Sequence, residues 1–171
     1  MSLLIIGALV LCFSFVLLVG PPYLPTMDKQ VEAALDLLAL EKGQVLLELG
    51  CGDGKVLVAA ARRGWQVTGI ELNPVLVLLC WLRTVRYRRQ VKLVWGNYWH
   101  TGLWPKADGI FGFVLPKFMT KLDETIIAWR KQTKITKSAK TAPLKLASFA
   151  FAIPNKTIDR QQAGVFLYIY K

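Results

Sequence analysis

Short apolar runs alternate with amphipathic segments along most of the chain. Runs rich in Val, Leu, Ile and aromatic residues predict strands over 45–49, 65–70, 91–95, 110–114, 144–153 and 164–170. Apolar residues at helical spacing predict helices over 27–40, 55–63, 74–87 and 118–131, with Thr26 as a cap of the first helix. This alternation predicts an α/β fold with a Rossmann-like, doubly wound, mostly parallel sheet that binds ligands at the carboxyl ends of its strands.

The start of the chain has a different pattern. No charged residue occurs between Leu3 and Val19, and the first charged residue of the chain is Asp28. The run approaches the ~20 apolar residues that cross a bilayer, so we expect a transmembrane anchor over 1–20 and one domain over 21–171. A cleaved signal peptide is the alternative, but the start lacks a basic residue. All 22 Lys and Arg follow the run, which predicts a single-pass membrane protein with a cytoplasmic domain and the run in the lipid bilayer.

A glycine-rich turn connects the first predicted strand to the second predicted helix. It contains Gly50, Gly52 and Gly54, which permit a sharp turn and a close backbone approach to a ligand. The helix that follows directs its unpaired N–H groups into the same crevice. Glu71 ends the second predicted strand 17 residues after Gly54, close to the ~20-residue offset at which a carboxylate reaches ribose hydroxyls. The pattern indicates a site for an adenosine-containing cofactor.

The residues around the glycines favour one class of cofactor. Their G-x-G-x-G spacing differs from the G-x-G-x-x-G spacing of dinucleotide sites. Glu48 before the turn and Asp53 within it would repel a diphosphate but attract a ligand with an ammonium and a sulfonium. S-adenosylmethionine is such a ligand. In the alternative interpretation, Glu48 and Asp53 only cap the helix and bind no ligand. A nicotinamide cofactor is a further alternative that this spacing and these acids disfavour.

The run from Glu48 to Gly54 resembles motif I of class I S-adenosylmethionine-dependent methyltransferases. More narrowly, the chain resembles the membrane-anchored protein-lysine N-methyltransferases that act on the ATP synthase c-subunit and the adenine nucleotide translocase. The resemblance rests on residues 23–26, 48–54, 69–74, 97–99 and 113–116. Members of that family usually carry other residues at the positions of Glu48, Cys51, Val75 and Asn97. The changes at Val75 and Asn97 bear on the substrate side or the adenine contact.

The resemblance implies a class I methyltransferase fold, S-adenosylmethionine as the cofactor, and a set of cofactor-binding residues. These residues are Thr26, Glu48, Gly50, Cys51, Gly52, Asp53, Gly54, Glu71, Leu72, Asn73, Asn97 and Tyr98. No catalytic residue is assigned. Candidates for the substrate side are Tyr23, Tyr98, Trp99 and Pro116, with plain packing as the alternative. The single histidine, His100, is expected at a surface turn because it has no visible orienting partner.

Cysteine content and charge narrow the class of protein. The three cysteines form no pattern and only one histidine is present, so we expect no metal site and a reducing compartment. The net charge is +11, and basic residues cluster over 83–92 and 131–145. A solvated surface, a lipid surface and nucleic acid are open interpretations of these clusters. Nucleic acid is disfavoured as a partner because no RNA-recognition signature accompanies them.

Three functions are open on this sequence. The one that we favour is a protein-lysine N-methyltransferase whose partner is a membrane or membrane-adjacent protein with an accessible lysine. The second function keeps S-adenosylmethionine but transfers the methyl group to a small molecule, a lipid headgroup or RNA. The third is a non-catalytic relative that binds the cofactor.

Overall fold

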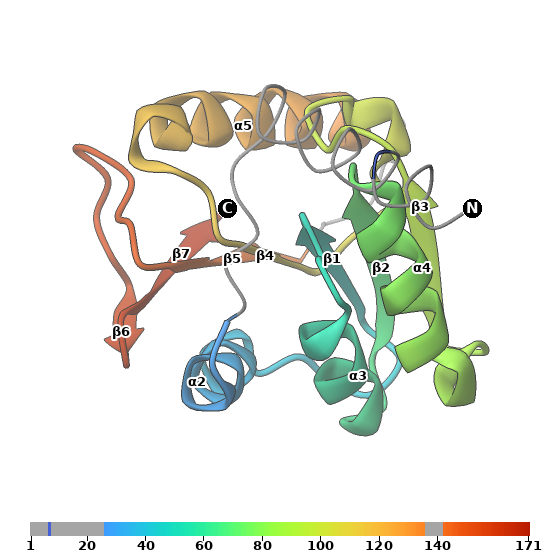
Figure 1. Cartoon of the computed structure of the whole chain (residues 1–171). Coiled ribbons are helices and arrows are strands. Elements are labelled where there is room, and N and C mark those ends of the chain that lie inside the picture. The colour runs from blue at the N-terminus through green and yellow to red at the C-terminus, as the bar shows by residue number, and fades with distance from the viewer. Residues whose placement is uncertain (1–6, 8–25, 136–141) are drawn as a thin grey trace.

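Seven strands form one mostly parallel sheet within the residues that the structure describes, which are 26–135, 142–171 and Gly7 (Figure 1). The structure is a computed structural model. The strands are β1 (Val45–Leu49), β2 (Gln66–Glu71), β3 (Val91–Trp95), β4 (Gly109–Gly112), β5 (Leu144–Phe149), β6 (Arg160–Gln162) and β7 (Val165–Tyr170). Their order is β3-β2-β1-β4-β5-β7-β6, with β1 to β5 parallel and β7 antiparallel to both β5 and β6. The predicted Rossmann-like sheet is confirmed.

Helices cover both faces of this sheet. The α-helices are α2 (Asp28–Leu38), α3 (Lys55–Arg62), α4 (Pro74–Arg83) and α5 (Met119–Ile135), and the 3-10 helices are η1 (Val85–Tyr87), η2 (Thr101–Leu103) and η3 (Pro116–Phe118). Figure 1 shows α2 and α3 below the sheet and α5 above it. Leu46 of β1 lies in a buried cluster with residues of α2, α3 and α4, whereas its neighbour Leu47 lies in a second cluster with α5. Because both faces of the central strands are buried, their sequences are continuously apolar rather than alternating.

The helix boundaries differ from the prediction for local reasons. The first helix starts at Asp28, and its N-cap is Met27 rather than Thr26. The predicted helix over 74–87 is interrupted at Thr84, whose hydroxyl donates a hydrogen bond to the Cys80 carbonyl (2.7 Å), and the chain continues as η1. The breaks change the ends of the predicted helices, but the number and order of the described α-helices agree with the prediction.

Two strands differ from the prediction by more than two residues. β5 ends at Phe149 rather than at residue 153, because Ala150 adopts a left-handed backbone with φ 67° that cannot continue a strand. β6 was not predicted, since its three residues are polar and exposed at the outer edge of the sheet. A strand without an apolar face leaves no hydrophobic pattern in the sequence.

The membrane prediction requires correction. Among the described residues, no helix is both long and apolar enough to cross a bilayer. The longest of them, α5, has 17 residues and carries charged side chains such as Lys121 and Asp123. This finding contradicts the predicted single-pass membrane localisation, which we withdraw. The segment between Leu3 and Val19 and the domain boundary predicted at residue 21 lie outside the described residues, apart from Gly7.

Candidate functional site

The loop after β1 turns at three glycines with left-handed backbone conformations. Gly50, Gly52 and Gly54 have φ angles of 76°, 53° and 80°, which other residues adopt only with strain. The N–H groups of Gly50 and Cys51 donate to the Ile70 carbonyl at 2.9 and 3.1 Å, and so hold the loop against the end of β2. Gly54 is the N-cap of α3, so the loop leads directly into the positive end of that helix.

The Glu71 carboxylate at the end of β2 organises two loops. Its Oε2 accepts a hydrogen bond from the Gly52 N–H (2.9 Å), and its Oε1 accepts from the N–H groups of Leu72 (2.9 Å) and Asn73 (2.8 Å). Asn73 in turn caps α4, because its Oδ1 accepts from the Val75 N–H at 2.9 Å. Oε2 accepts one bond here and can accept a second, for example from a ribose hydroxyl.

Glu48 near the end of β1 is a buried acid with an unused acceptor. Its side chain is buried, and its Oε2 has no hydrogen-bond partner among the described residues. Burial raises the pKa of this carboxyl well above its usual value, and the nearby Cys80, Glu71 and Asp53 raise it further. A buried carboxylate without a donor is costly unless a cation or donor approaches it. The residue therefore fits the ammonium group of S-adenosylmethionine.

The side chains of Cys51 and Asp53 have structural partners within the fold. The Cys51 Sγ lies 4.0 Å from the buried Cys80 Sγ, and this contact together with burial raises the pKa of the Cys51 thiol. The Asp53 carboxylate pairs with the Arg83 guanidinium and accepts from the Lys55 N–H at 3.3 Å. Asp53 therefore supports the first turn of α3, as the alternative interpretation of the sequence proposed for the loop acids.

An aromatic cluster lies at the same edge of the sheet, after β3 and β4. The ring centroids of Tyr98 and Trp99 are 5.0 Å apart, and those of Trp99 and Phe118 are 5.8 Å apart. Lys121 of α5 holds its Nζ 4.4 Å from the centre of the Trp99 ring. Pro116 opens η3, which ends at Phe118. Since the cluster already holds the Lys121 ammonium against an aromatic face, its chemistry also suits the side chain of a second lysine.

Tyr98 connects this cluster to the glycine loop. A Cβ placed on Gly50 would lie 3.9 Å from the Tyr98 ring, and the Tyr98 carbonyl accepts from the Trp104 Nε1–H at 2.7 Å. Burial, and secondarily the charge of Glu71, raise the pKa of Tyr98 to about 12. Asn97 fixes the turn before it, because its Oδ1 accepts from the Trp99 N–H at 3.0 Å. The Tyr98 hydroxyl is thus neutral at physiological pH and can donate a hydrogen bond.

The structure brings most of the predicted site residues to the carboxyl ends of β1, β2 and β3. Thr26 lies beside the start of α3, where its carbonyl accepts from the Lys55 Nζ at 3.1 Å. Tyr23 lies outside the described residues, and His100 is exposed after β3. In the part of the chain that the structure describes, no group of His, Cys, Asp and Glu could hold a metal ion.

Three neighbours of the site were missed by the sequence analysis. Arg83 pairs with Asp53, Cys80 fills the space behind the loop, and Lys121 covers the Trp99 ring. Arg83 was interpreted only as part of a basic surface cluster. Because each of these residues lies more than twenty positions from its partner, no local spacing could have revealed the pairing.

Together, the sheet order, the glycine loop after β1 and the carboxylate at the end of β2 define a class I methyltransferase domain. The sequence profile of the ANTKMT methyltransferase domain matches residues 48–159. The chain belongs to this family, which confirms the resemblance and the methyltransferase class predicted from motif I. The matched residues include the glycine loop, Glu71 and the aromatic cluster.

Several similar proteins carry lysine methyltransferase names. The human lysine N-methyltransferase named for the ATP synthase c-subunit is 32% identical over 111 residues, which cover 61% of this chain and 45% of that protein. The Xenopus laevis protein of the same name is 28% identical over 142 residues, 81% of this chain and 57% of that protein. A protein-lysine N-methyltransferase of Saccharolobus islandicus is 33% identical over 54 residues, 30% of this chain and 34% of that protein. The chain spans about half the length of the two vertebrate relatives.

Solved structures confirm the fold. An RNA methyltransferase from Salinibacter ruber in complex with S-adenosyl-L-homocysteine superposes with a TM-score of 0.65 at 23% identity, over 86% of this chain and 92% of that chain. A methyltransferase from Geobacter sulfurreducens, also with S-adenosyl-L-homocysteine, gives a TM-score of 0.54 at 19% identity, over 77% of this chain and 53% of that chain. At these identities the similarity concerns the architecture and not the acceptor.

Proposed function

We propose that the protein is an S-adenosylmethionine-dependent methyltransferase that methylates a lysine side chain of another protein. The family assignment supports methyl transfer from S-adenosylmethionine, and the names of the relatives support a lysine acceptor. One observation carries the proposal. The glycine loop, Glu71 and the unpartnered buried oxygen of Glu48 lie at one edge of the sheet, within the family's matched residues.

Two carboxylates in this proposal have an oxygen with free bonding capacity. Glu48 Oε2 would bind the ammonium group, and N–H groups in the first turn of α3 beyond Lys55 would bind the carboxylate. Glu71 Oε2 accepts from a ribose hydroxyl. The adenine contacts are assigned to the residues that follow β2 and β3, namely Leu72, Asn73, Asn97 and Tyr98. Thr26, Cys51 and Asp53 serve through the backbone and through their support of α3.

The aromatic cluster is assigned to the acceptor. S-adenosylmethionine supplies an electrophilic methyl group. The neutral lysine Nζ would accept this methyl group, and S-adenosylhomocysteine would be the product that leaves. Tyr98, Trp99 and Phe118 exclude water from the amine and orient it, while Pro116 sets the position of η3. The lysine proton leaves to solvent, and Tyr23 stays a prediction from the sequence alone.

The first acceptor to test is the ATP synthase c-subunit, after which the vertebrate relatives are named. The test has a binding step and a transfer step. Isothermal titration of the full chain uses S-adenosylmethionine, S-adenosylhomocysteine and NAD, with Gly52→Arg as the disabled variant. Gly102→Arg is the matched control, because nothing lies within 4 Å of a Cβ at Gly102. We expect the methyl-donor pair to bind the wild type and the control but not Gly52→Arg.

The transfer step uses S-adenosylmethionine with a labelled methyl group and the ATP synthase c-subunit as the acceptor. Mass spectrometry of the digested acceptor then identifies the modified side chain. Methyl-lysine formed by the wild type and the Gly102→Arg control, but not by Gly52→Arg, supports the proposal. Cofactor binding with label only on another class of acceptor would refute the lysine assignment, and absence of cofactor binding would refute the methyltransferase assignment.

A further inference from the structure

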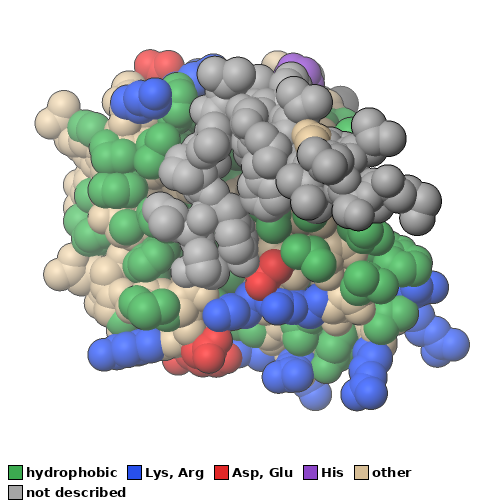
Figure 2. Space-filling model, viewed as in Figure 1, with side chains coloured by type: hydrophobic (Ala, Val, Ile, Leu, Met, Phe, Trp, Pro, Cys, Tyr) green, Lys and Arg blue, Asp and Glu red, His purple; other side chains and the backbone are tan. Residues whose placement is uncertain are grey.

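The helix α4 is apolar on its outer face as well as on its inner face. Its inward side buries Leu76 and Cys80. Its outward side and the adjoining turn expose five large apolar residues, each by about half: Leu78, Leu79, Trp81, Leu82 and Val85. Four of them follow the i, i+3, i+4, i+7 spacing of a single helical stripe, which on most helices faces a core. Figure 2 shows hydrophobic side chains gathered over the position of α4.

The edge of the sheet extends this apolar surface. β3 is the outermost strand on that side and contacts α4. Trp95 at its end is 68% exposed, and its Nε1–H donates to the Leu72 carbonyl at 3.0 Å. The five residues of α4 and η1 together with Trp95 are called the α4 face below. Large apolar side chains exposed together on neighbouring elements are typical of an interaction site.

The sequence of the α4 face carries basic residues and no acid, although Arg83 of α4 pairs with Asp53 of the glycine loop. No Asp or Glu occurs over residues 72–107. Exposed cations follow the stripe directly, at Arg86, Arg88, Arg89 and Lys92. The Arg88 guanidinium lies 4.6 Å from the centre of the Trp81 ring, so a cation and an apolar side chain share one position on the surface. The partner must therefore offer both apolar material and negative charge.

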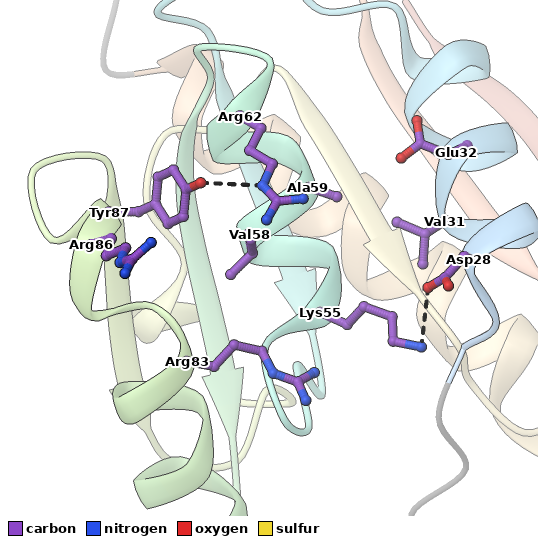
Figure 3. A pocket seen from close by; sticks show the side chains of 10 residues that line it. All are labelled: Asp28, Val31, Glu32, Lys55, Val58, Ala59, Arg62, Arg83, Arg86 and Tyr87. Carbon is purple, nitrogen blue, oxygen red and sulfur yellow. Dashed lines mark hydrogen bonds and ion pairs between the residues drawn. The ribbon is translucent and has the colours of Figure 1, made fainter.

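A polar groove adjoins the C-terminal end of α4. It has a volume of about 570 Å³ and is lined by residues of α2, α3, α4 and η1 (Figure 3). Arg62, Arg83 and Arg86 line it, and Arg62 Nε donates to the Tyr87 hydroxyl at 3.2 Å. Asp28 and Glu32 of α2 also line the groove, and Arg83 pairs with Asp53, so a phosphate-bearing group would be met by Arg62 and Arg86.

We propose that the α4 face docks on the surface of an anionic lipid bilayer as a peripheral contact, without any helix crossing the bilayer. Leucine and tryptophan side chains enter the boundary between headgroups and acyl chains, and the arginines contact the lipid phosphates. A second copy of the chain is a poor partner, because it would bring the exposed basic residues of two identical faces together. The exposed side chains stand on a single helix and an edge strand, a geometry that suits insertion into a bilayer surface.

The test follows the full chain with vesicles of phosphatidylcholine, with and without phosphatidylserine. Hydrogen exchange measured on individual peptides identifies the segment that contacts the vesicles, even if another segment of the chain also binds them. We expect anionic vesicles to slow exchange over 76–92 and to leave α5 unchanged. Flotation with the vesicles quantifies binding. Leu78→Gln/Leu82→Gln should weaken it at least about tenfold, given the apolar area withdrawn from the bilayer.

Two matched variants control for general effects. Ile127→Gln removes an exposed apolar side chain from α5, on the opposite face of the sheet, and should bind as the wild type does. Arg88→Gln/Arg89→Gln should weaken binding to anionic vesicles about fivefold for each arginine and leave binding to neutral vesicles unchanged. Exchange over 76–92 that vesicles do not alter, in protein with intact cofactor binding, overturns the proposal and points to an acidic protein surface as the partner. Equal loss of binding in Ile127→Gln overturns it as well.

Discussion

The Glu71 carboxylate should contribute to stability as well as to cofactor binding. It accepts hydrogen bonds from the N–H groups of Gly52, Leu72 and Asn73 at 2.8–2.9 Å. Hydrogen bonds to a charged acceptor contribute about 1.5–3 kcal/mol each when fully buried. Because the two loops can admit water once the acceptor is removed, about 1 kcal/mol for each bond is the realistic share, and Glu71→Ala should lose about 3 kcal/mol.

A graded pair of variants makes this expectation testable. Glu71→Gln keeps one acceptor oxygen and turns an amide donor toward one of the two loops, so it should lose about 1–2 kcal/mol. Urea unfolding, followed by tryptophan fluorescence, measures the free energy of unfolding of both variants without cofactor. Glu41→Ala is the control, because Glu41 is exposed. If Glu71→Ala unfolds within about 0.5 kcal/mol of that control, the two loops do not depend on this carboxylate and the reasoning is refuted.

Three further predictions concern the same crevice. Burial raises the pKa of Glu48, so the contribution of this residue to stability is complete below the ordinary carboxyl pKa and is lost as pH rises through the raised value. Glu48→Gln should therefore flatten the decline in melting temperature of the cofactor-free protein from pH 5 to 8. The same variant should bind S-adenosylmethionine more weakly in titration. Gly54→Ala places a Cβ 2.6 Å from the Cys80 Sγ at a φ of 80° and should lose about 2–4 kcal/mol in denaturant unfolding, whereas Gly102→Ala should change little. Since the pKa of Tyr98 is raised to about 12, Tyr98→Phe should leave the shape of the pH–rate profile between pH 7 and 10 unchanged. If the wild-type profile has a titration step in this range that the variant lacks, Tyr98 titrates there and the raised pKa is contradicted.

The features that were predictable from the sequence are those fixed by short segments. The central strands appear as apolar runs because both of their faces are buried, and the glycine loop appears because its three turning residues lie within five positions. The partners of the loop were not predictable, since Asp53 and Arg83 lie thirty positions apart and Cys51 and Cys80 lie twenty-nine apart. The apolar sequence of α4 predicted a helix, but it carried no signal that one side of that helix stays exposed.

The charges of the crevice also suggest the order in which ligands bind. Burial and the charges of Glu71 and Asp53 raise the pKa of Glu48, so a positive charge is favoured in the empty crevice. Such a crevice attracts the cationic cofactor but also stabilises the protonated form of an acceptor lysine, which cannot attack a methyl group. A bound cofactor adds a net positive charge beside these acids and so lowers the pKa of the incoming lysine. We therefore expect ordered binding with the cofactor first, in which S-adenosylhomocysteine competes with S-adenosylmethionine but not with the acceptor. Competition of S-adenosylhomocysteine with the acceptor would show instead that the lysine enters a crevice whose charge the cofactor does not control.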